Sequence, residues 1–196
     1  ALNFGCLFAY VSGSSLVLID VLGVSRSTYG YLFACTALGL TVGALTSARL
    51  GRRGVKHRRL ITWGMVAIVG TSLVLAALAW TGRLPVSVLV PVAVLGFIGH
   101  GVVRPNAAQS ALEPMPDIAG VASAVLSSTG MLAGALASAA VASLFDGHSA
   151  RSMTGTMVVF AVASAALYAG VVRRAERRWE QGRRTAAAPA LPDVAA

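Results

Sequence analysis

The sequence is short of charged residues. Only 12% of its 196 residues are Asp, Glu, Lys or Arg, while 56% are hydrophobic. A typical soluble domain carries about 25% charged residues. One soluble core cannot enclose this much apolar surface, so the composition excludes a soluble globular protein and predicts an integral membrane protein.

Acidic residues and cysteines are also scarce, seven and two respectively. Cys6 and Cys35 both fall inside apolar runs, as small buried hydrophobic side chains do. The sequence contains no paired carboxylates, zinc-ligand spacing or phosphate-binding glycine loop. The serine of Gly70-Thr71-Ser72 lacks the following glycine of a membrane serine protease. We therefore expect no metal site, no cofactor and no enzymatic activity.

The net charge of +9 raises the alternative of a nucleic-acid-binding protein. However, twelve of the sixteen basic residues lie in two stretches, 49–59 and 173–184. Long apolar runs separate these stretches, and aromatic residues are almost absent from them. Such clustering is typical of membrane proteins, in which it determines orientation, so we expect no nucleic-acid partner.

Six apolar runs are long enough to cross the bilayer. A helix needs about 20 mostly apolar residues to span roughly 30 Å of hydrocarbon. The runs predict an all-α transmembrane domain at residues 1–172, with spans at 2–19, 28–48, 60–80, 86–108, 118–145 and 152–172. They are continuous and far longer than the strands of a membrane barrel, which excludes that fold. Residues 173–196 are expected to form a basic and then disordered cytoplasmic tail.

The basic residues predict the orientation as well. Six spans place the 49–59 loop and the 173–184 stretch on one side, and leave Arg26, Arg83 and Arg151 on the other. By the positive-inside rule, both chain ends are expected in the cytoplasm. The excess of arginine over lysine, fifteen to one, indicates a GC-rich bacterial genome and hence a bacterial inner membrane.

Small residues recur every four positions in two of the spans. Gly39 and Gly43 do so in the second span, and Gly130 and Gly134 in the fifth. Helices in lipid associate by close backbone approach, because the hydrophobic effect offers little between two apolar surfaces. We expect these glycines to mediate helix packing.

Polar side chains at membrane depth are candidates for function. His100 and Arg104 lie four apart, on one face of the fourth span, with Asn106 beyond them. They are expected to line a water-filled pathway, although Arg104 could instead reach toward the headgroups. In the first span, Tyr10, Ser12 and Ser14 could contact a substrate; alternatively, the serines bond to carbonyls of the preceding helical turn.

Residues 96–126 resemble the tenth-to-eleventh helix region of the Bcr/CflA drug-resistance transporters, a group within the major facilitator superfamily. Pro105-Asn106, Ala111-Leu112 and Ala119-Gly-Val-Ala-Ser-Ala124 occur there in the same order. Residues 8–15 look like that group's seventh helix, where proline more often occupies position 15. The resemblance extends across essentially all six spans.

The basic loop also resembles the signature between the second and third helices of each facilitator half. Arg49, Arg52 and Arg53 match its basic end, and Ala48 stands where the signature usually has Asp. The resemblance implies a cytoplasmic gate at this loop. The alternative is that these arginines serve only as orientation anchors.

The resemblance implies a twelve-helix, proton-driven exporter of drug-like molecules that rocks two six-helix halves about a central site. This chain would be the C-terminal half, itself two inverted three-helix repeats. Its partners would be an N-terminal six-helix half, protons, a small-molecule substrate and the lipid bilayer. Two alternatives stay open: a facilitator-type transporter of a small metabolite, such as a sugar, amino acid or nucleoside, and a six-span membrane protein without transport activity.

Overall fold

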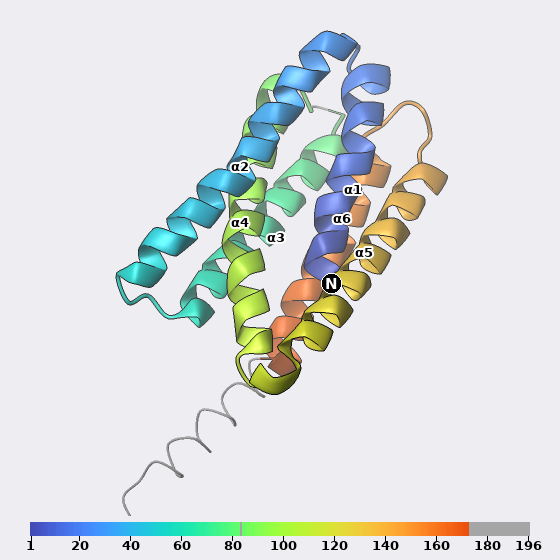
Figure 1. Ribbon diagram of the computed structural model, residues 1–196. Helices are drawn as coiled ribbons and strands as arrows, with labels where there is room; N and C mark the ends of the chain where they lie inside the picture. Colours follow the sequence, from blue (N-terminus) through green and yellow to red (C-terminus); the bar gives the residue numbers. More distant parts are fainter. Residues whose placement is uncertain (83, 173–196) are drawn as a thin grey trace, which may run out of the picture.

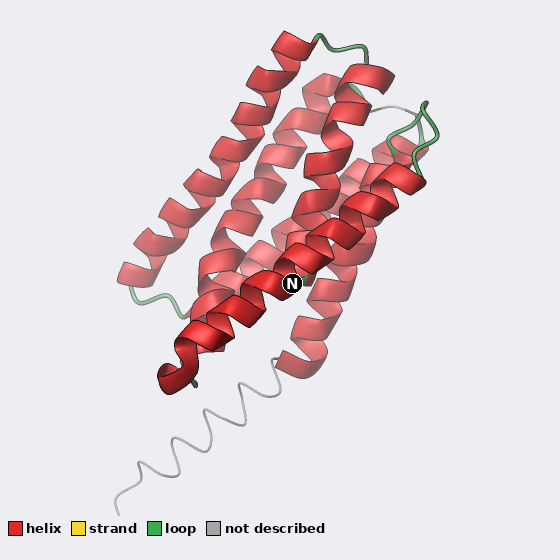
Figure 2. Ribbon diagram, turned by 45° about the vertical axis from the view of Figure 1, so that its right-hand side comes forward, coloured by secondary structure: helices red, strands yellow, loops and turns green. Residues whose placement is uncertain are grey.

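The computed structural model describes residues 1–82 and 84–172, and all regular structure in that part of the chain is helical (Figures 1 and 2). Six of its helices are long and apolar enough to cross a membrane. They are α1 (Leu2–Ser15, continued by the π-helical turn η1, Leu16–Val21), α2 (Arg26–Arg52), α3 (His57–Trp80), α4 (Val86–Leu112), α5 (Ala119–Ser143) and α6 (Arg151–Leu167, continued by η3, Tyr168–Val172). A 3-10 turn, η2 (Pro116–Ile118), precedes α5. The predicted all-α class with six spans is confirmed.

Several helices extend beyond their apolar runs. α2 ends at Arg52 instead of residue 48, α3 begins at His57 instead of residue 60, and α4 continues to Leu112 instead of residue 108. Helices end where the backbone turns or is capped, whereas hydropathy marks only the part inside lipid. At the start of α2, for example, the Ser25 side chain accepts a hydrogen bond from the Thr28 amide at 3.2 Å. The predicted tail, residues 173–196, lies outside the described residues.

The six helices form two equivalent groups of three. α4 packs against α2 and α3, α1 packs against α5 and α6, and α3 packs against α6. Exchanging α1–α3 with α4–α6 maps these main contacts onto one another. Figure 1 shows α1 and α4 running in opposite directions, so the two groups are inverted repeats of one another, as predicted.

The repeats place four helices on one side of the bundle and two behind them. α2, α4, α1 and α5 lie side by side toward the viewer in Figure 1, and α3 and α6 lie behind. The main core lies between α1, α3, α4 and α6, around Tyr10, Leu75, Phe97 and Met153. Half of the most apolar part of α1 and of α4 is buried (50% each), against 22% in α2 and 28% in α5.

The glycines predicted to pack lie at helix contacts. A Cβ atom added to Gly39 would lie 2.8 Å from the Val94 carbonyl oxygen of α4, and one added to Gly43 would collide with the Ile98 carbonyl. A Cβ atom added to Gly134 of α5 would lie 3.0 Å from the Phe8 ring of α1. One added to Gly130 would lie 3.8 Å from the Phe4 ring. At the α2–α4 crossing, therefore, backbone meets backbone, whereas at the α1–α5 crossing glycine makes room for aromatic rings.

Candidate functional site

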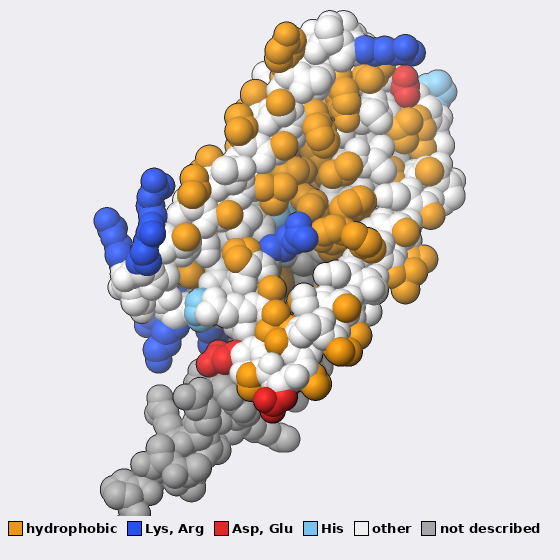
Figure 3. Space-filling view, in the orientation of Figure 1, with side chains coloured by type: hydrophobic (Ala, Val, Ile, Leu, Met, Phe, Trp, Pro, Cys, Tyr) orange, Lys and Arg blue, Asp and Glu red, His pale blue; other side chains and the backbone are white. Residues whose placement is uncertain are grey.

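The face formed by α2, α4, α1 and α5 is hollowed along its middle. α1 and α4 make few direct contacts with each other, although both are central on this face. Figure 3 shows a shallow hollow between α2 and α4 on one side and α1 and α5 on the other, lined mainly by hydrophobic side chains. A Lys or Arg side chain stands in its middle. We refer to this face as the open face.

Arg104 of α4 carries the positive charge of the open face. Its side chain is exposed, and its guanidinium carbon lies 4.8 Å from the centre of the Phe4 ring of α1. Gly99 is the middle residue of α4, so Arg104 lies only about 7 Å further along the helix axis. When α4 is centred in the bilayer, that depth is inside the hydrocarbon, whose half-thickness is about 15 Å.

Arg104 has no acidic partner within the described residues. The described acidic residues are all exposed and lie in loops or near helix ends: Asp20, Glu113, Asp117 and Asp146. The contact of the guanidinium with the Phe4 ring is a cation–π interaction. An aromatic ring attracts the cation but does not neutralise its charge.

His100 lies one helical turn before Arg104 and is buried, with 3% of its surface exposed. Its ring meets the Phe97 ring edge-on, with the centroids 6.1 Å apart. Among the described residues it has no hydrogen-bond partner. The sequence prediction placed His100 on the wall of a pathway; the structure places it beneath the surface, beside Arg104.

The polar residues of α1 are buried to different extents. Tyr10 is fully enclosed, with its ring edge-on to Phe97 at 5.0 Å. Its hydroxyl approaches Thr36 but forms no hydrogen bond of good geometry. The Ser12 hydroxyl donates to the Phe8 carbonyl at 2.8 Å. Of the two predicted roles for this serine, the structure therefore shows the bond to the preceding turn.

Ser14 bridges two helices. Its hydroxyl donates to the Val11 carbonyl at 3.2 Å and lies 3.1 Å from the Tyr29 hydroxyl of α2. Ser14 is fully buried, so it joins α1 to α2 instead of facing the hollow.

Asn106 lies on the side of α4 away from Arg104. Its amide nitrogen donates to the Ser47 hydroxyl of α2 at 2.5 Å and to the Val102 carbonyl at 2.6 Å. Its amide oxygen accepts a hydrogen bond from Nδ1 of His57, the first residue of α3, at 2.6 Å. Asn106 thus joins α2, α3 and α4. The spacing indicates that Asn106 faces away from Arg104, because residues two apart on a helix point in nearly opposite directions.

The arginines of the predicted gate, Arg49, Arg52 and Arg53, are exposed where α2 ends. The 49–59 loop and the end of η3 lie at the same end of the bundle in Figure 1. We call this the basic end. Within the described residues, no group of three or more His, Cys, Asp or Glu side chains is placed to hold a metal ion.

Phe4 was not predicted from the sequence as a site residue. Phe4 lies on α1 and Arg104 on α4, the first helices of the two repeats, and no local pattern links the two residues. Its contact with Arg104 depends on how α1 packs beside α4, which periodicity within one helix does not reveal.

Comparisons with known proteins agree with this architecture. The family model described as Major Facilitator Superfamily matches residues 1–138. The chain is 31% identical to a bicyclomycin resistance protein homolog of Haemophilus influenzae, over 72% of this chain and 35% of that protein. It is 29% identical to the uncharacterized MFS-type transporter YdgK of Bacillus subtilis, over 86% of this chain and 41% of that protein. No solved structure gives a significant match.

The chain therefore matches only about a third to two fifths of the length of these relatives (35% and 41%). The match to a bicyclomycin resistance protein homolog supports the predicted resemblance to the Bcr/CflA drug transporters. The family match, the six spans and the inverted repeats all agree. The chain belongs to the Major Facilitator Superfamily.

Proposed function

We propose that this chain is the C-terminal six-helix half of a proton-coupled multidrug efflux antiporter that works by alternating access. The observation that carries the proposal is the exposure of Arg104 at membrane depth on the open face. A charged side chain at that depth faces water or protein far more readily than lipid. Two facilitator halves enclose such a pathway between them, with the substrate site near the midplane.

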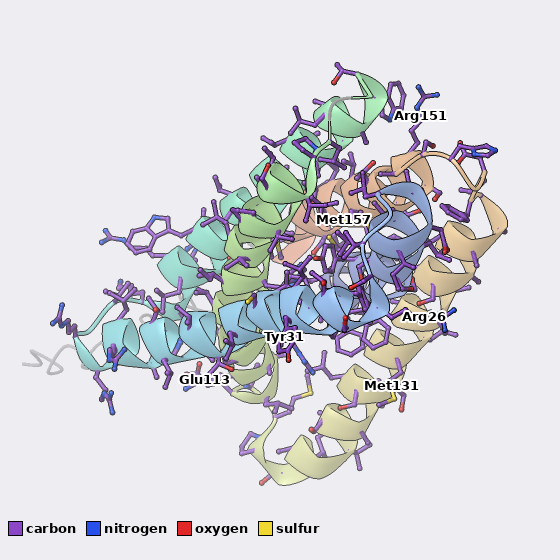
Figure 4. All side chains as sticks on the ribbon, turned by 90° about the horizontal axis from the view of Figure 1, so that it is seen from above. Arg26, Tyr31, Glu113, Met131, Arg151 and Met157 are labelled. Carbon is purple, nitrogen blue, oxygen red and sulfur yellow. The ribbon has the colours of Figure 1, made fainter. Side chains whose placement is uncertain are left out.

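The exposure of α2 and α5 supports the pairing of two halves. α2 and α5 flank the open face and bury the least of their surface within this chain. Seen from above, Tyr31 of α2 and Met131 of α5 lie on the side away from α3 and α6 (Figure 4). These two side chains are 77% and 69% exposed. An N-terminal half would cover them and close the hollow.

We propose that the basic end faces the cytoplasm of a bacterial cell and that the protein lies in the inner membrane. Six basic residues of the 49–59 loop lie at this end, whereas Arg26 and Arg151 lie at the opposite end. The arginines at the end of α2 serve in this proposal as orientation anchors.

Proton coupling would depend on the other half. The described spans hold no acidic residue near their middles. An acid that binds and releases the transported proton would therefore lie on the N-terminal helices. His100 is buried beside Arg104, behind the open face, and its loss would alter substrate range or export rate.

The test is transport by the complete protein in proteoliposomes with an imposed pH gradient. The compounds are bicyclomycin, nalidixate and ethidium, set against a sugar, an amino acid and a nucleoside. Gradient-driven movement of at least one of the three drugs, and of none of the metabolites, supports drug export. Movement of a metabolite alone would identify the facilitator alternative, and movement of none of the compounds would favour a non-transport protein.

A further inference from the structure

The guanidinium of Arg104 has unused hydrogen-bonding capacity. An arginine side chain has five N–H donors arranged around the edge of a planar group. The contact with Phe4 involves the face of the ring, 4.8 Å from the guanidinium carbon. Within the described residues, the Arg104 side chain forms no hydrogen bond or ion pair. Its donors therefore remain available on the open face.

A second polar group lies beside it without a partner. His100 is 97% buried, four residues before Arg104, and has no hydrogen bond among the described residues. An imidazole can donate one hydrogen bond and accept another when it is neutral. The exposed cation of the open face thus has a second polar side chain buried directly beside it.

The surroundings of these two side chains are apolar and aromatic. Phe4 and Phe8 of α1 stack with their centroids 4.7 Å apart, and Phe97 lies against His100. Hydrophobic side chains line most of the hollow in Figure 3. A compound held here would meet one positive pole and a mainly apolar wall.

We infer that the hollow binds small organic anions with an aromatic body, whose carboxylate or similar group pairs with Arg104. Arginine binds carboxylates through two parallel hydrogen bonds, and it does so more strongly where water is scarce. A lipophilic cation would be repelled by Arg104, which already occupies a face of the Phe4 ring. This inference rests on the proposed function, because the hollow becomes a substrate site only when a second half faces it.

The test measures binding, not transport. Three probes are used on the complete protein in lipid nanodiscs at slightly alkaline pH: nalidixate, its ethyl ester and ethidium. Nalidixate and the ester share their ring system and differ in the negative charge. We expect nalidixate to bind about tenfold or more tightly than the ester, the range of a charge-assisted hydrogen-bonded pair. We expect ethidium to bind more weakly than both.

Variants then test whether Arg104 supplies the positive charge that binds nalidixate. Arg104→Gln should reduce nalidixate affinity about tenfold and leave the ester unchanged, and Arg104→Lys should retain part of the preference. Arg151→Gln is the matched control, because it removes an exposed arginine at the far end of the bundle. It should leave all three affinities unchanged.

Two results would overturn the inference. The first is equally tight binding of nalidixate and either the ester or ethidium by the wild-type protein. This result can be obtained without any variant. The second is an Arg104→Gln protein that melts normally and still prefers nalidixate. If Arg104 instead pairs with a carboxylate of the other half, nalidixate should show no advantage and Arg104→Gln should lower the melting temperature. Failure of the proposed function is distinct, because it appears as absence of transport whatever the binding preference.

Discussion

Asn106 shows how a single side chain can hold three helices together. Its amide satisfies the Ser47 hydroxyl of α2 and the His57 ring of α3, and it is 4% exposed. Both partners are distant in the chain. Removing the amide would leave two buried or half-buried polar groups without this hydrogen bond. Leaving such a partner unsatisfied costs more free energy than replacing both partners by apolar groups.

Asn106→Ala should therefore destabilise the folded protein by about 1–3 kcal/mol, the cost of leaving buried polar partners unsatisfied. The measurement is thermal unfolding of the complete protein in detergent. Gln109→Ala is the control, because Gln109 is an exposed amide on the same helix. Equal melting temperatures for the two variants would contradict the role assigned to Asn106.

Asp146 organises the loop between α5 and α6. Its carboxylate accepts hydrogen bonds from the Ser149 hydroxyl at 2.7 Å, the Ser149 amide at 2.8 Å and the His148 amide at 3.0 Å. These donors, the Ser149 hydroxyl first, lower the pKa of Asp146 from 3.8 to about 2. The ionised carboxylate therefore stabilises this loop structure. The stabilisation is fully present above the ordinary pKa of 3.8 and is lost as the pH falls through about 2.

A carboxyl-carbon NMR titration of labelled Asp146 should thus show a midpoint near 2. Ser149→Ala removes the strongest donor and should raise the midpoint toward the ordinary value, while both amide donors remain. A wild-type midpoint at the ordinary aspartate pKa, unchanged in Ser149→Ala, would show that the loop does not hold the carboxylate in solution.

At the scale of the helix, glycine spacing decides which surfaces touch. Gly43 of α2 and Gly101 of α4 bring two backbones together, and a Cβ on either would collide with a carbonyl of the opposite helix. Gly99 of α4 meets the Gly64 carbonyl of α3 in the same way, 2.9 Å from an added Cβ. α4 is therefore held on two sides, which leaves its Arg104 side toward the open face.

Gly43→Ala should lower the stability of the complete protein by about 1–3 kcal/mol, because a methyl group at a backbone contact cannot be accommodated by a side-chain rotation. Gly70→Ala is the matched control. Gly70 lies inside α3 with no atom within 4 Å of an added Cβ. Its replacement should be neutral or stabilising by about 0.5–1 kcal/mol, through helix propensity.

Thermal unfolding in detergent separates the two variants. A Gly43→Ala protein as stable as Gly70→Ala would mean that α2 can move away from α4 without loss of contact energy. That result would also argue against the glycine contacts as the features that decide how the helices pack.

At the scale of the whole molecule, the two ends differ in charge. Arg53 is exposed at the basic end, and His148 is exposed in the loop at the opposite end. In a protein whose native Cys6 and Cys35 are replaced by serine, a single cysteine can report the location of each end. Arg53→Cys should react with a membrane-impermeant maleimide only in inverted vesicles, and His148→Cys only in intact spheroplasts. Labelling with the opposite pattern would reverse the proposed orientation.

The molecule also shows what helix-by-helix prediction leaves out. His100, Arg104 and Asn106 belong to one short stretch of α4, and from the sequence all three were expected to line one pathway. The structure leaves Arg104 exposed, buries His100 and turns Asn106 toward α2 and α3. The partners of Asn106 are 49 and 59 residues away, so no local pattern contains them.

The sequence by itself determined the class of the protein, its six spans and the difference in charge between its ends. These are properties of each segment alone, because a helix in lipid must satisfy its backbone hydrogen bonds internally and be apolar along about 20 residues. Only the tertiary structure decided which polar side chain faces the hollow and which joins helices. That choice depends on the rotation of α4 between α2, α3 and α1, and the rotation is determined by contacts between helices that are distant in the chain.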